Sequence, residues 1–253
     1  MLAHAATTAG AIAAFGANAL TIGAPAVFLA LFADGVGRAG SSVLYPTVRR
    51  GPRGSRRVAL SFDDGPDPEV TPAVLDALAN HGARATFFAI GRALEAHPQL
   101  ARRVVAEGHE LGNHSWRHSR WQGFSSPREQ VAEIERGERA IANLVSNGAP
   151  PLYRAPFGVK TPPFVVAANA KRLTMVAWSL HGRDTGGADA HEIAARVLRK
   201  IRPGDIVLMH DGHDLTGHHR SACADAVSLI LSGLRERGLG CVTVSELLSP
   251  PPA

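Results

Sequence analysis

The sequence predicts one α/β domain in which parallel strands form a barrel. Three observations favour this class: short apolar runs alternate with capped helical segments from residue 57 onward, about seven such strands can be counted, and polar side chains follow directly after them. The length of 253 residues suits one domain that buries a single large core. At this length a barrel is favoured over an open sheet.

The predicted strands are short runs of apolar and β-branched residues. They cover residues 57–62, 85–90, 110–112, 152–155, 173–179, 205–209 and 240–244. The predicted helices cover residues 71–82, 98–108, 126–146, 189–200 and 221–237, and a further one begins at residue 161. Thr71 and Pro72 suit a first helical turn, and Gly82 suits an exit. Asp189 with Glu192 has the pattern of a capping box.

The first 33 residues contain no Lys, Arg, Asp or Glu, and residues 9–33 are nearly all apolar or small. Because this length can cross a bilayer core, we expect a membrane anchor. A secretory signal requires positive charge before its apolar segment, and none is present here. The arginines after the segment favour a cytoplasmic location for the rest of the chain. The side of the membrane is therefore left open. We expect residues 1–50 to form this apolar segment and a linker, and residues 51–253 to form the domain.

The net charge of +5 at pH 7 does not indicate a nucleic-acid partner. The arginines are scattered apart from a group between Arg49 and Arg57, and no basic and aromatic reading surface accompanies them. An anionic envelope surface fits this charge equally well. Cys223 and Cys241 are too few for a zinc knuckle or a disulfide framework, so we expect two buried thiols, although they could pair.

Two adjacent carboxylates, Asp63 and Asp64, end the first predicted strand and are followed by Gly65-Pro66. Side chains alternate faces along a strand and Gly-Pro turns the backbone, so the two carboxylates point in different directions. One of them can hold a metal while its neighbour takes a proton. This division of labour is typical of metal-assisted hydrolases.

His114 and His118 follow the third predicted strand and lie four residues apart. In a helical turn both imidazoles project from one face and can bind one ion. With Asp64 as a third ligand, the set contains two neutral nitrogens and one carboxylate. This set suits zinc and leaves positions open for water and substrate, although iron, cobalt and nickel accept similar ligands.

Polar residues also follow the later strands, namely Arg154, Asp184 and His210. The carboxyl ends of all strands in an α/β barrel lie on one rim, where barrel enzymes carry their chemistry. We therefore expect these three residues to meet Asp63 and the histidine pair at that rim. Each of these residues alone could be a helix cap or a solvated surface charge. Residues with such roles would be scattered at random and would not all follow strands.

Five segments follow one another in a fixed order. They are Ser61-Phe62-Asp63-Asp64-Gly65-Pro66, His114-Ser115-Trp116-Arg117-His118, Arg154-Ala155-Pro156-Phe157, residues 178–184 and Leu208-Met209-His210. These segments resemble the motifs of the polysaccharide deacetylase (NodB-homology) family, carbohydrate esterase family four. The resemblance covers about residues 57–245. It implies a distorted (β/α)7-type barrel, the NodB-homology fold, that removes N-acetyl or O-acetyl groups from sugar polymers with a divalent metal.

The resemblance implies roles for the residues nearest the metal. Asp64, His114 and His118 would bind the ion, which we expect to be Zn²⁺, with Co²⁺, Ni²⁺ or Fe²⁺ as alternatives. Asp63 would be the general base that takes a proton from the attacking metal-bound water, and Arg154 would hold Asp63 in place. A charged arginine beside Asp63 favours the ionised carboxylate that a base requires.

The resemblance also implies roles on the substrate side of the site. His210 would be the general acid that protonates the departing amine, and Asp184 would orient it. The backbone amide near Phe157 would help to stabilise the oxyanion, and Leu208 would line the slot for the acetyl methyl. Apart from the resemblance, the position of Trp116 beside the metal residues makes its ring a candidate face for a sugar, with packing as the alternative.

The chain departs from the family pattern in its fourth motif, which usually carries a second Asp and a Trp. His181 and Thr185 stand around Asp184 instead, which puts substrate recognition in doubt more than chemistry. A His-rich loop, residues 210–219, could hold a further metal, but a loop over the site is the favoured interpretation.

These observations predict a metal-dependent hydrolase that acts on N-acetylated sugars of an envelope polysaccharide or a lipid-linked glycan. We expect it to be membrane-associated, at the cell envelope. Two alternatives stay open: a deformylase or other C–N hydrolase on a membrane-linked sugar, and a catalytically silent sugar-binding protein. The sequence indicates neither the particular glycan nor an oligomeric state.

Overall fold

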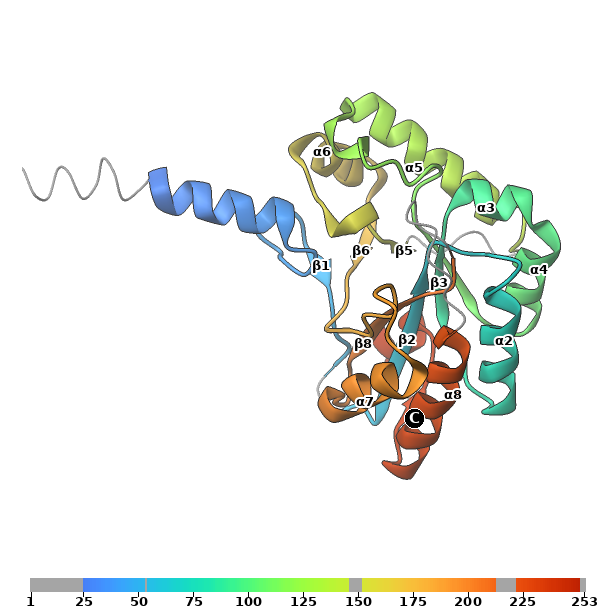
Figure 1. The fold of residues 1–253 in the computed structure, drawn as a ribbon. Coiled ribbons are helices and arrows are strands. Elements are labelled where there is room, and N and C mark those ends of the chain that lie inside the picture. Colours follow the sequence, from blue (N-terminus) through green and yellow to red (C-terminus); the bar gives the residue numbers. More distant parts are fainter. Residues whose placement is uncertain (1–24, 53, 146–151, 213–221, 251–253) are drawn as a thin grey trace, which may run out of the picture.

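A computed structural model describes residues 25–52, 54–145, 152–212 and 222–250. Its strands form one sheet in the order β1-β6-β5-β4-β3-β2-β8-β7, with β9 paired to β2. The paired strands are parallel throughout. The strands are β1 (Thr47–Val48), β2 (Arg57–Asp63), β3 (Thr86–Ala89), β4 (Glu110–Asn113), β5 (Leu152–Tyr153), β6 (Thr174–Val176), β7 (Leu180–His181), β8 (Ile206–His210) and β9 (Gly240–Cys241). The sheet curls into an open, distorted barrel surrounded by helices, as Figure 1 shows, which confirms the predicted fold class.

The helices on the outside of the sheet are α2 (Thr71–Asn80), α3 (Gly91–Ala96), α4 (Pro98–Ala106), α5 (Pro127–Ala142), α6 (Pro162–Lys171), α7 (Ala190–Lys200), α8 (Ala222–Glu236) and α9 (Val244–Leu248), with short 3₁₀ turns η1 (Gln122–Phe124) and η2 (Pro156–Gly158). Six of these helices, α2 and α4 to α8, begin within one residue of the predicted positions, and the other two, α3 and α9, were not predicted. Asp189 accepts a hydrogen bond from the Glu192 backbone N–H, as its capping pattern predicts.

Several elements differ from the sequence prediction. The last predicted strand, residues 240–244, stops at Cys241, because Thr243 and Glu246 form a full capping box that begins α9 at Val244. Helix α3 and strands β1 and β7 were not predicted. All three are short, and α3 ends at Ala96, because His97 precedes Pro98, which begins the next helix.

Strand β2 fixes the position of the rim residues. Its residues from Val58 to Asp63 are buried, and it pairs with β3 on one side and β8 on the other. The register sets Asp63 opposite His210 of β8. A hydrophobic cluster packs β2, β3 and β8 against α2, α7 and α8, so the carboxyl ends of these strands are held side by side.

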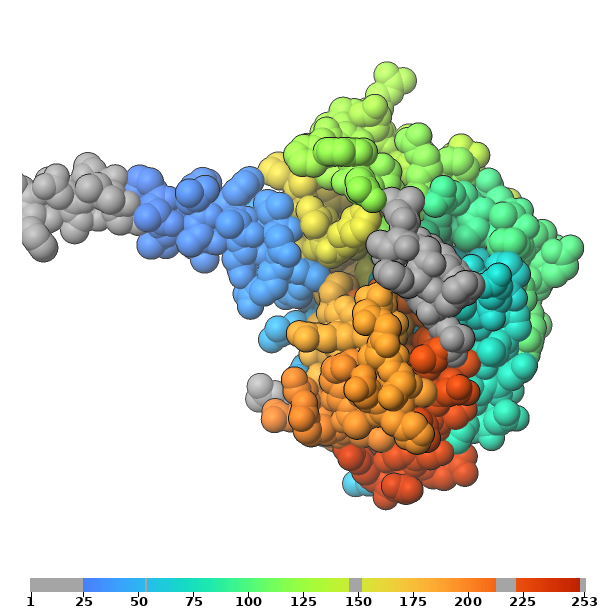
Figure 2. All heavy atoms as spheres, in the orientation of Figure 1, coloured from blue at the N-terminus to red at the C-terminus, as the bar shows by residue number. Residues whose placement is uncertain are grey.

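The chain before β2 has two parts. Residues 25–37 form a helix that extends away from the barrel, as Figures 1 and 2 show. Residues 9–24 of the predicted anchor lie outside the described residues, and among the helices that the structure does describe, none is long and apolar enough to cross a membrane.

The residues after this helix attach to the barrel. Strand β1 pairs with β6, and the Tyr45 hydroxyl donates a hydrogen bond to the Leu173 carbonyl at 2.8 Å. The buried Lys160 ammonium donates to the carbonyls of Arg38, Ala39 and Ser41. Residues 38–48, within the predicted apolar segment and linker, are therefore built into the edge of the sheet.

The two cysteines are free thiols. Cys223 is buried, as expected, whereas Cys241 is half-buried at the end of β9.

Candidate active site

The first two site residues come from the carboxyl end of β2. Asp63 ends the strand, and Asp64 follows it with a positive φ of 78°, which turns its carboxylate away from that of Asp63. The turn is packed closely against the segment after β8. A Cβ on Gly65 would lie 2.2 Å from an Asp211 carboxylate oxygen, and one on Gly212 would lie 2.3 Å from the Asp64 backbone. Only glycine fits at these two positions.

His114 and His118 lie in a loop after β4, not in the helical turn that their spacing predicts. Positive φ angles at Ser115 and His118 fold this loop back on itself. The Asn113 side chain accepts from the Ser115 backbone N–H, and the Ser115 hydroxyl accepts from the His118 backbone N–H. The two imidazole centres are nevertheless only 4.7 Å apart, so the pair converges by a different backbone route.

The Asp64, His114 and His118 side chains form a buried group in which the three ligand atoms lie within 4.8 Å of one another. The Asp64 Oδ1 atom is 3.7 Å from Nε2 of His114 and 3.6 Å from Nε2 of His118. Two ligands at 2.0–2.1 Å from a tetrahedral zinc are about 3.4 Å apart. The donor types and spacing therefore fit a divalent ion.

The hydrogen bonding of His114 suits a metal ligand. Its Nδ1 atom lies 2.8 Å from the Arg154 carbonyl oxygen, an acceptor, so Nδ1 carries the proton and Nε2 keeps its lone pair toward Asp64. Burial and the neighbouring His118 lower the pKa of His114 to about 3. His114 is thus a neutral donor throughout the physiological pH range.

Arg154 lies beneath Asp63, and both are almost fully buried. The Arg154 Nη1 donates to Asp63 Oδ1 at 2.6 Å, and Nη2 donates to the Ser61 hydroxyl at 2.9 Å. The guanidinium carbon also lies 3.9 Å from the Phe88 ring centre. These contacts fix the rotamer of Asp63 and compensate a buried positive charge.

His210, at the end of β8 beside Asp63, forms an acid–imidazole pair with Asp184. One Asp184 oxygen lies 3.0 Å from His210 Nδ1, and the other accepts from the His210 backbone N–H at 2.7 Å. Burial disfavours the charged imidazole, but the hydrogen bond and charge of Asp184 outweigh it and raise the pKa of His210. Burial likewise opposes the charge on Asp184, and the bond to His210 still lowers the pKa of Asp184. His210 keeps Nε2 available to exchange a proton with a bound ligand.

A cavity of about 170 Å³ joins these groups. It is lined by Asp63, Asp64, His114, His118, His210 and the non-ligand residues Ala155, Phe157, Gly158, Trp178, His181 and Leu208. Of the three predicted substrate contacts, Phe157 and Leu208 are therefore in this wall. The Phe157 ring centre lies 4.5 Å from that of His118.

Trp116 does not line this cavity. Its ring lies under the Arg136 guanidinium, at 3.2 Å, and against Gly91 of α3. This position favours packing over sugar contact. His213, His218 and His219 of the predicted His-rich loop lie outside the described residues.

Trp178 and Asp211 are at the site, although the sequence motifs gave neither of them a role. Trp178 lines the cavity and follows β6. Its position after an apolar strand is the signal that could have predicted a place at the rim. Asp211 is fully buried behind the Asp64 turn, where one oxygen accepts from the Thr71 hydroxyl at 2.7 Å. Burial raises the pKa of Asp211 to about 7, with the charges of Asp64 and Asp63 adding to the effect.

Comparison with known proteins agrees with this arrangement. A family model described as polysaccharide deacetylase matches residues 50–176. A chitooligosaccharide deacetylase of a Bradyrhizobium species is 43% identical over 175 residues, covering 69% of this chain and 78% of the relative. A peptidoglycan-N-acetylglucosamine deacetylase of Bacillus cereus is 38% identical over 199 residues, covering 78% of this chain and 90% of the relative.

Solved structures of similar proteins share the fold. A peptidoglycan N-acetylglucosamine deacetylase bound to a naphthyl N-oxidanyl-benzamide superposes with a TM-score of 0.75 at 32% identity, covering 80% of this chain and 92% of that one. A carbohydrate esterase family four pseudoenzyme from Bacillus anthracis superposes with a TM-score of 0.71 at 26% identity, covering 81% of this chain and 69% of that one.

Proposed function

Because this chain belongs to the polysaccharide deacetylase family, we propose that it is a metal-dependent hydrolase that removes N-acetyl groups from the sugar residues of a glycan. The observation that carries the proposal is the convergence of three groups in one cavity. These groups are the Asp64–His114–His118 donors, the Arg154–Asp63 pair and the Asp184–His210 pair. The relatives named above are deacetylases of chitooligosaccharide and of peptidoglycan, so a polymer of N-acetylated amino sugars is the proposed substrate class.

Asp64, His114 and His118 would hold the ion, for which zinc is our first candidate because two imidazoles and a carboxylate suit it. When bound, a divalent ion supplies Lewis acidity toward the acetyl carbonyl and toward water. The neutral imidazole of His114, with its proton held on Nδ1, is ready to donate without first losing a proton.

Asp63 accepts a proton from the attacking water in this proposal. Its carboxylate is held at one oxygen by Arg154, which leaves Oδ2 directed toward the metal donors at 3.7 Å from His114 Nε2. Because Arg154 is locked by Ser61 and Phe88, the base has one position rather than several.

His210 delivers a proton to the departing sugar nitrogen. Asp184 fixes the proton on the His210 Nδ1 side and favours the imidazolium, so Nε2 carries the proton that is transferred. Without this transfer the amine would have to leave as an anion, which is a far poorer leaving group.

The wall of the cavity binds the acetyl group. Leu208 provides the apolar surface for the methyl. The backbone amide near Phe157 stabilises the oxyanion, and the positive φ of Phe157 turns the peptide of this 3₁₀ segment for that role.

We further propose that residues 51–253 form the catalytic domain, that residues 1–50 lead into it, and that the protein works at the membrane or cell envelope.

The test is acetate release from N-acetylglucosamine oligomers by zinc-loaded protein. We expect Asp63→Asn to abolish turnover, by at least about 10³-fold, while the metal content stays unchanged. Asp76→Asn, an exposed acid on α2, is the matched control and should keep full activity.

Persistent activity in Asp63→Asn would show that the base is another residue. Wild-type protein that binds zinc but releases neither acetate nor formate would indicate a silent sugar-binding protein, as the pseudoenzyme relative illustrates. Preference for a formylated sugar would identify the deformylase alternative.

A further inference from the structure

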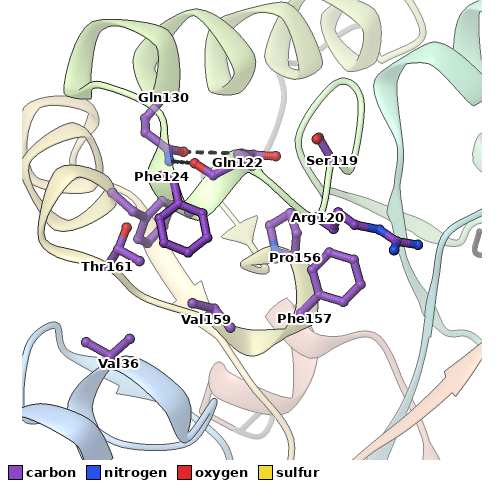
Figure 3. Close-up of a pocket in the computed structure, with 12 residues that line it drawn as sticks. Val36, Ser119, Arg120, Gln122, Phe124, Gln130, Pro156, Phe157, Val159 and Thr161 are labelled. Carbon is purple, nitrogen blue, oxygen red and sulfur yellow. Dashed lines mark hydrogen bonds between the residues drawn. The ribbon is translucent and has the colours of Figure 1, made fainter.

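A second and larger cavity lies beside the active site. Its volume is about 390 Å³, within the range of small-molecule sites. The carbon-rich part of its lining consists of Val36, Gly123, Phe124, Pro156, Phe157, Val159 and Phe164. In Figure 3, Val36 lies at one side of the cavity and Phe157 at the other, with Phe124 and Val159 between them.

Few polar atoms of this cavity are available to a ligand: among the described residues of its lining, Gln122 Oε1 and Thr161 Oγ1 are buried without a hydrogen-bond partner. Gln122 and Gln130 bond to each other, the Gln122 Nε2 donating to the Gln130 Oε1 at 3.3 Å. The Arg120 guanidinium points away from Phe124 in Figure 3. A sugar or peptide here would bury hydroxyl or amide groups against carbon without enough partners, whereas an apolar group would not.

Phe157 connects the two cavities. Its side chain lines both of them, is 54% exposed, and contacts the His118 ring. A ligand whose acetamido group occupies the active site can therefore continue past Phe157 into the larger cavity.

The opposite side of the larger cavity meets the helix of residues 25–37. Val36, near the end of this helix, is part of the lining. The preceding turns expose the large apolar side chains of Val27, Phe28, Leu29 and Leu31, and Phe124 at the cavity itself is 82% exposed. Apolar side chains are thus exposed on the helix and at the cavity, and Phe157 links the cavity to the active-site wall. Exposed apolar patches of this kind mark binding surfaces.

From the apolar lining, the shared Phe157 and the adjoining end of the helix we infer that the larger cavity binds the apolar chain of a glycolipid whose N-acetylated sugar enters the active site. The inference rests on the proposed function, since it specifies the substrate class of that same site. In this arrangement the lipid's apolar chain contacts the helix and the larger cavity, and the acetamido group of the sugar occupies the smaller cavity beside the metal donors.

The test compares the methyl, butyl and octyl β-glycosides of N-acetylglucosamine below the concentrations at which they form micelles. Acetate release gives KM for each, and calorimetry on the metal-free protein gives binding independently of turnover. We expect KM to fall with chain length, by at least about tenfold from methyl to octyl, because each buried methylene adds favourable transfer free energy.

Val159→Trp fills the cavity and should remove this advantage while leaving turnover of a chitooligosaccharide in place. Val166→Trp is the matched control, because Val166 is 57% exposed on α6 and does not line the cavity. Phe124→Ala, at an exposed position, is a second variant that does not depend on tolerance of a larger side chain, and it should weaken the octyl preference several-fold.

Equal KM and equal calorimetric affinity for methyl and octyl glycosides would overturn the inference, as would an octyl preference that survives in both Val159→Trp and Phe124→Ala. If no substrate is deacetylated, the proposed function fails, and calorimetry still decides the inference. Octyl-selective binding that Val159→Trp abolishes would support it, and absence of such binding would overturn it.

Discussion

His114 and His210 line the same cavity, His114 buried and His210 partly exposed, yet the pKa values of their imidazoles move in opposite directions. For His114, burial and the nearby His118 lower the pKa to about 3, and its Nδ1 partner is a backbone carbonyl. For His210, burial opposes the charge but the Asp184 carboxylate at Nδ1 raises the pKa. The group bonded to Nδ1 therefore separates a neutral metal donor from a proton donor within one small site.

The largest expected effect is a difference in metal content between variants of these two histidines. His114→Ala removes one of three buried donors, so we expect zinc affinity to fall by more than roughly 100-fold and acetate release by at least about 10³-fold. His210→Ala should lose about 10²- to 10⁴-fold in turnover and keep its zinc. Elemental analysis after dialysis, alongside acetate release, measures both. Loss of zinc in His210→Ala would show that the two histidines are not divided in this way.

The next effect concerns the charge that distinguishes His210. Asp184→Asn keeps the shape of the side chain but removes the carboxylate, so the pKa of His210 should fall. An acid that must be protonated loses activity as pH rises through its pKa, so the alkaline limb of kcat/KM should move to lower pH, with a kcat loss of roughly 10- to 100-fold.

The control for that shift is Asp189→Asn, an N-cap residue of α7 outside the cavity. It should leave the pH profile in place. An unchanged alkaline limb in Asp184→Asn would mean that another group limits the reaction at high pH.

A smaller effect is expected on the base side of the cavity. Ser61→Ala removes the hydroxyl that accepts from Arg154 Nη2 at 2.9 Å, while the 2.6 Å bond from Nη1 to Asp63 remains. Because this hydrogen bond affects the reaction only through the position of Asp63, which Nη1 still holds, we expect about a 3- to 10-fold decrease in kcat with unchanged metal content. Steady-state kinetics with elemental analysis measures this decrease, and a loss above 100-fold would show that Ser61 does more than hold Arg154.

Much of this site could be predicted from sequence because strand ends are local features. Apolar runs followed by Asp63, Arg154 and His210 mark the carboxyl ends of parallel strands, and a barrel brings those ends to one rim. The pairing of Asp63 with His210 depends on strand order and register, which alternation of apolar residues alone does not give.

The remaining features depend on tertiary contacts. The loop from His114 to His118 has two positive φ angles, supported by hydrogen bonds of Asn113 and Ser115 that spacing does not show. Trp116 packs beneath Arg136 of a helix distant in sequence, so its residue type alone could not separate packing from substrate contact.

Two buried carboxyl groups differ in the same way as the two imidazoles, and the smallest predicted effect concerns one of them. Asp184 and Asp211 are both buried, but a bond to His210 lowers the pKa of Asp184, whereas burial beside Asp64 and Asp63 raises that of Asp211 to about 7. Asp211 has a Thr71 hydroxyl at one oxygen, and Oδ1 has no hydrogen-bond partner within the described ranges. This buried position therefore favours the protonated, neutral form of Asp211.

Between pH 3.8 and about 7 the folded chain keeps a proton on Asp211 that the unfolded chain has released, so this carboxyl lowers the free energy of unfolding as pH rises through that window. Asp211→Asn lacks this dependence and should gain on the order of 1–3 kcal/mol relative to wild type between pH 5 and pH 8. Chemical denaturation of metal-free protein at both pH values measures the difference, with Asp76→Asn as the exposed control. If the stabilities of wild type and Asp211→Asn change in parallel between the two pH values, the Asp211 carboxyl is already ionised in the folded state.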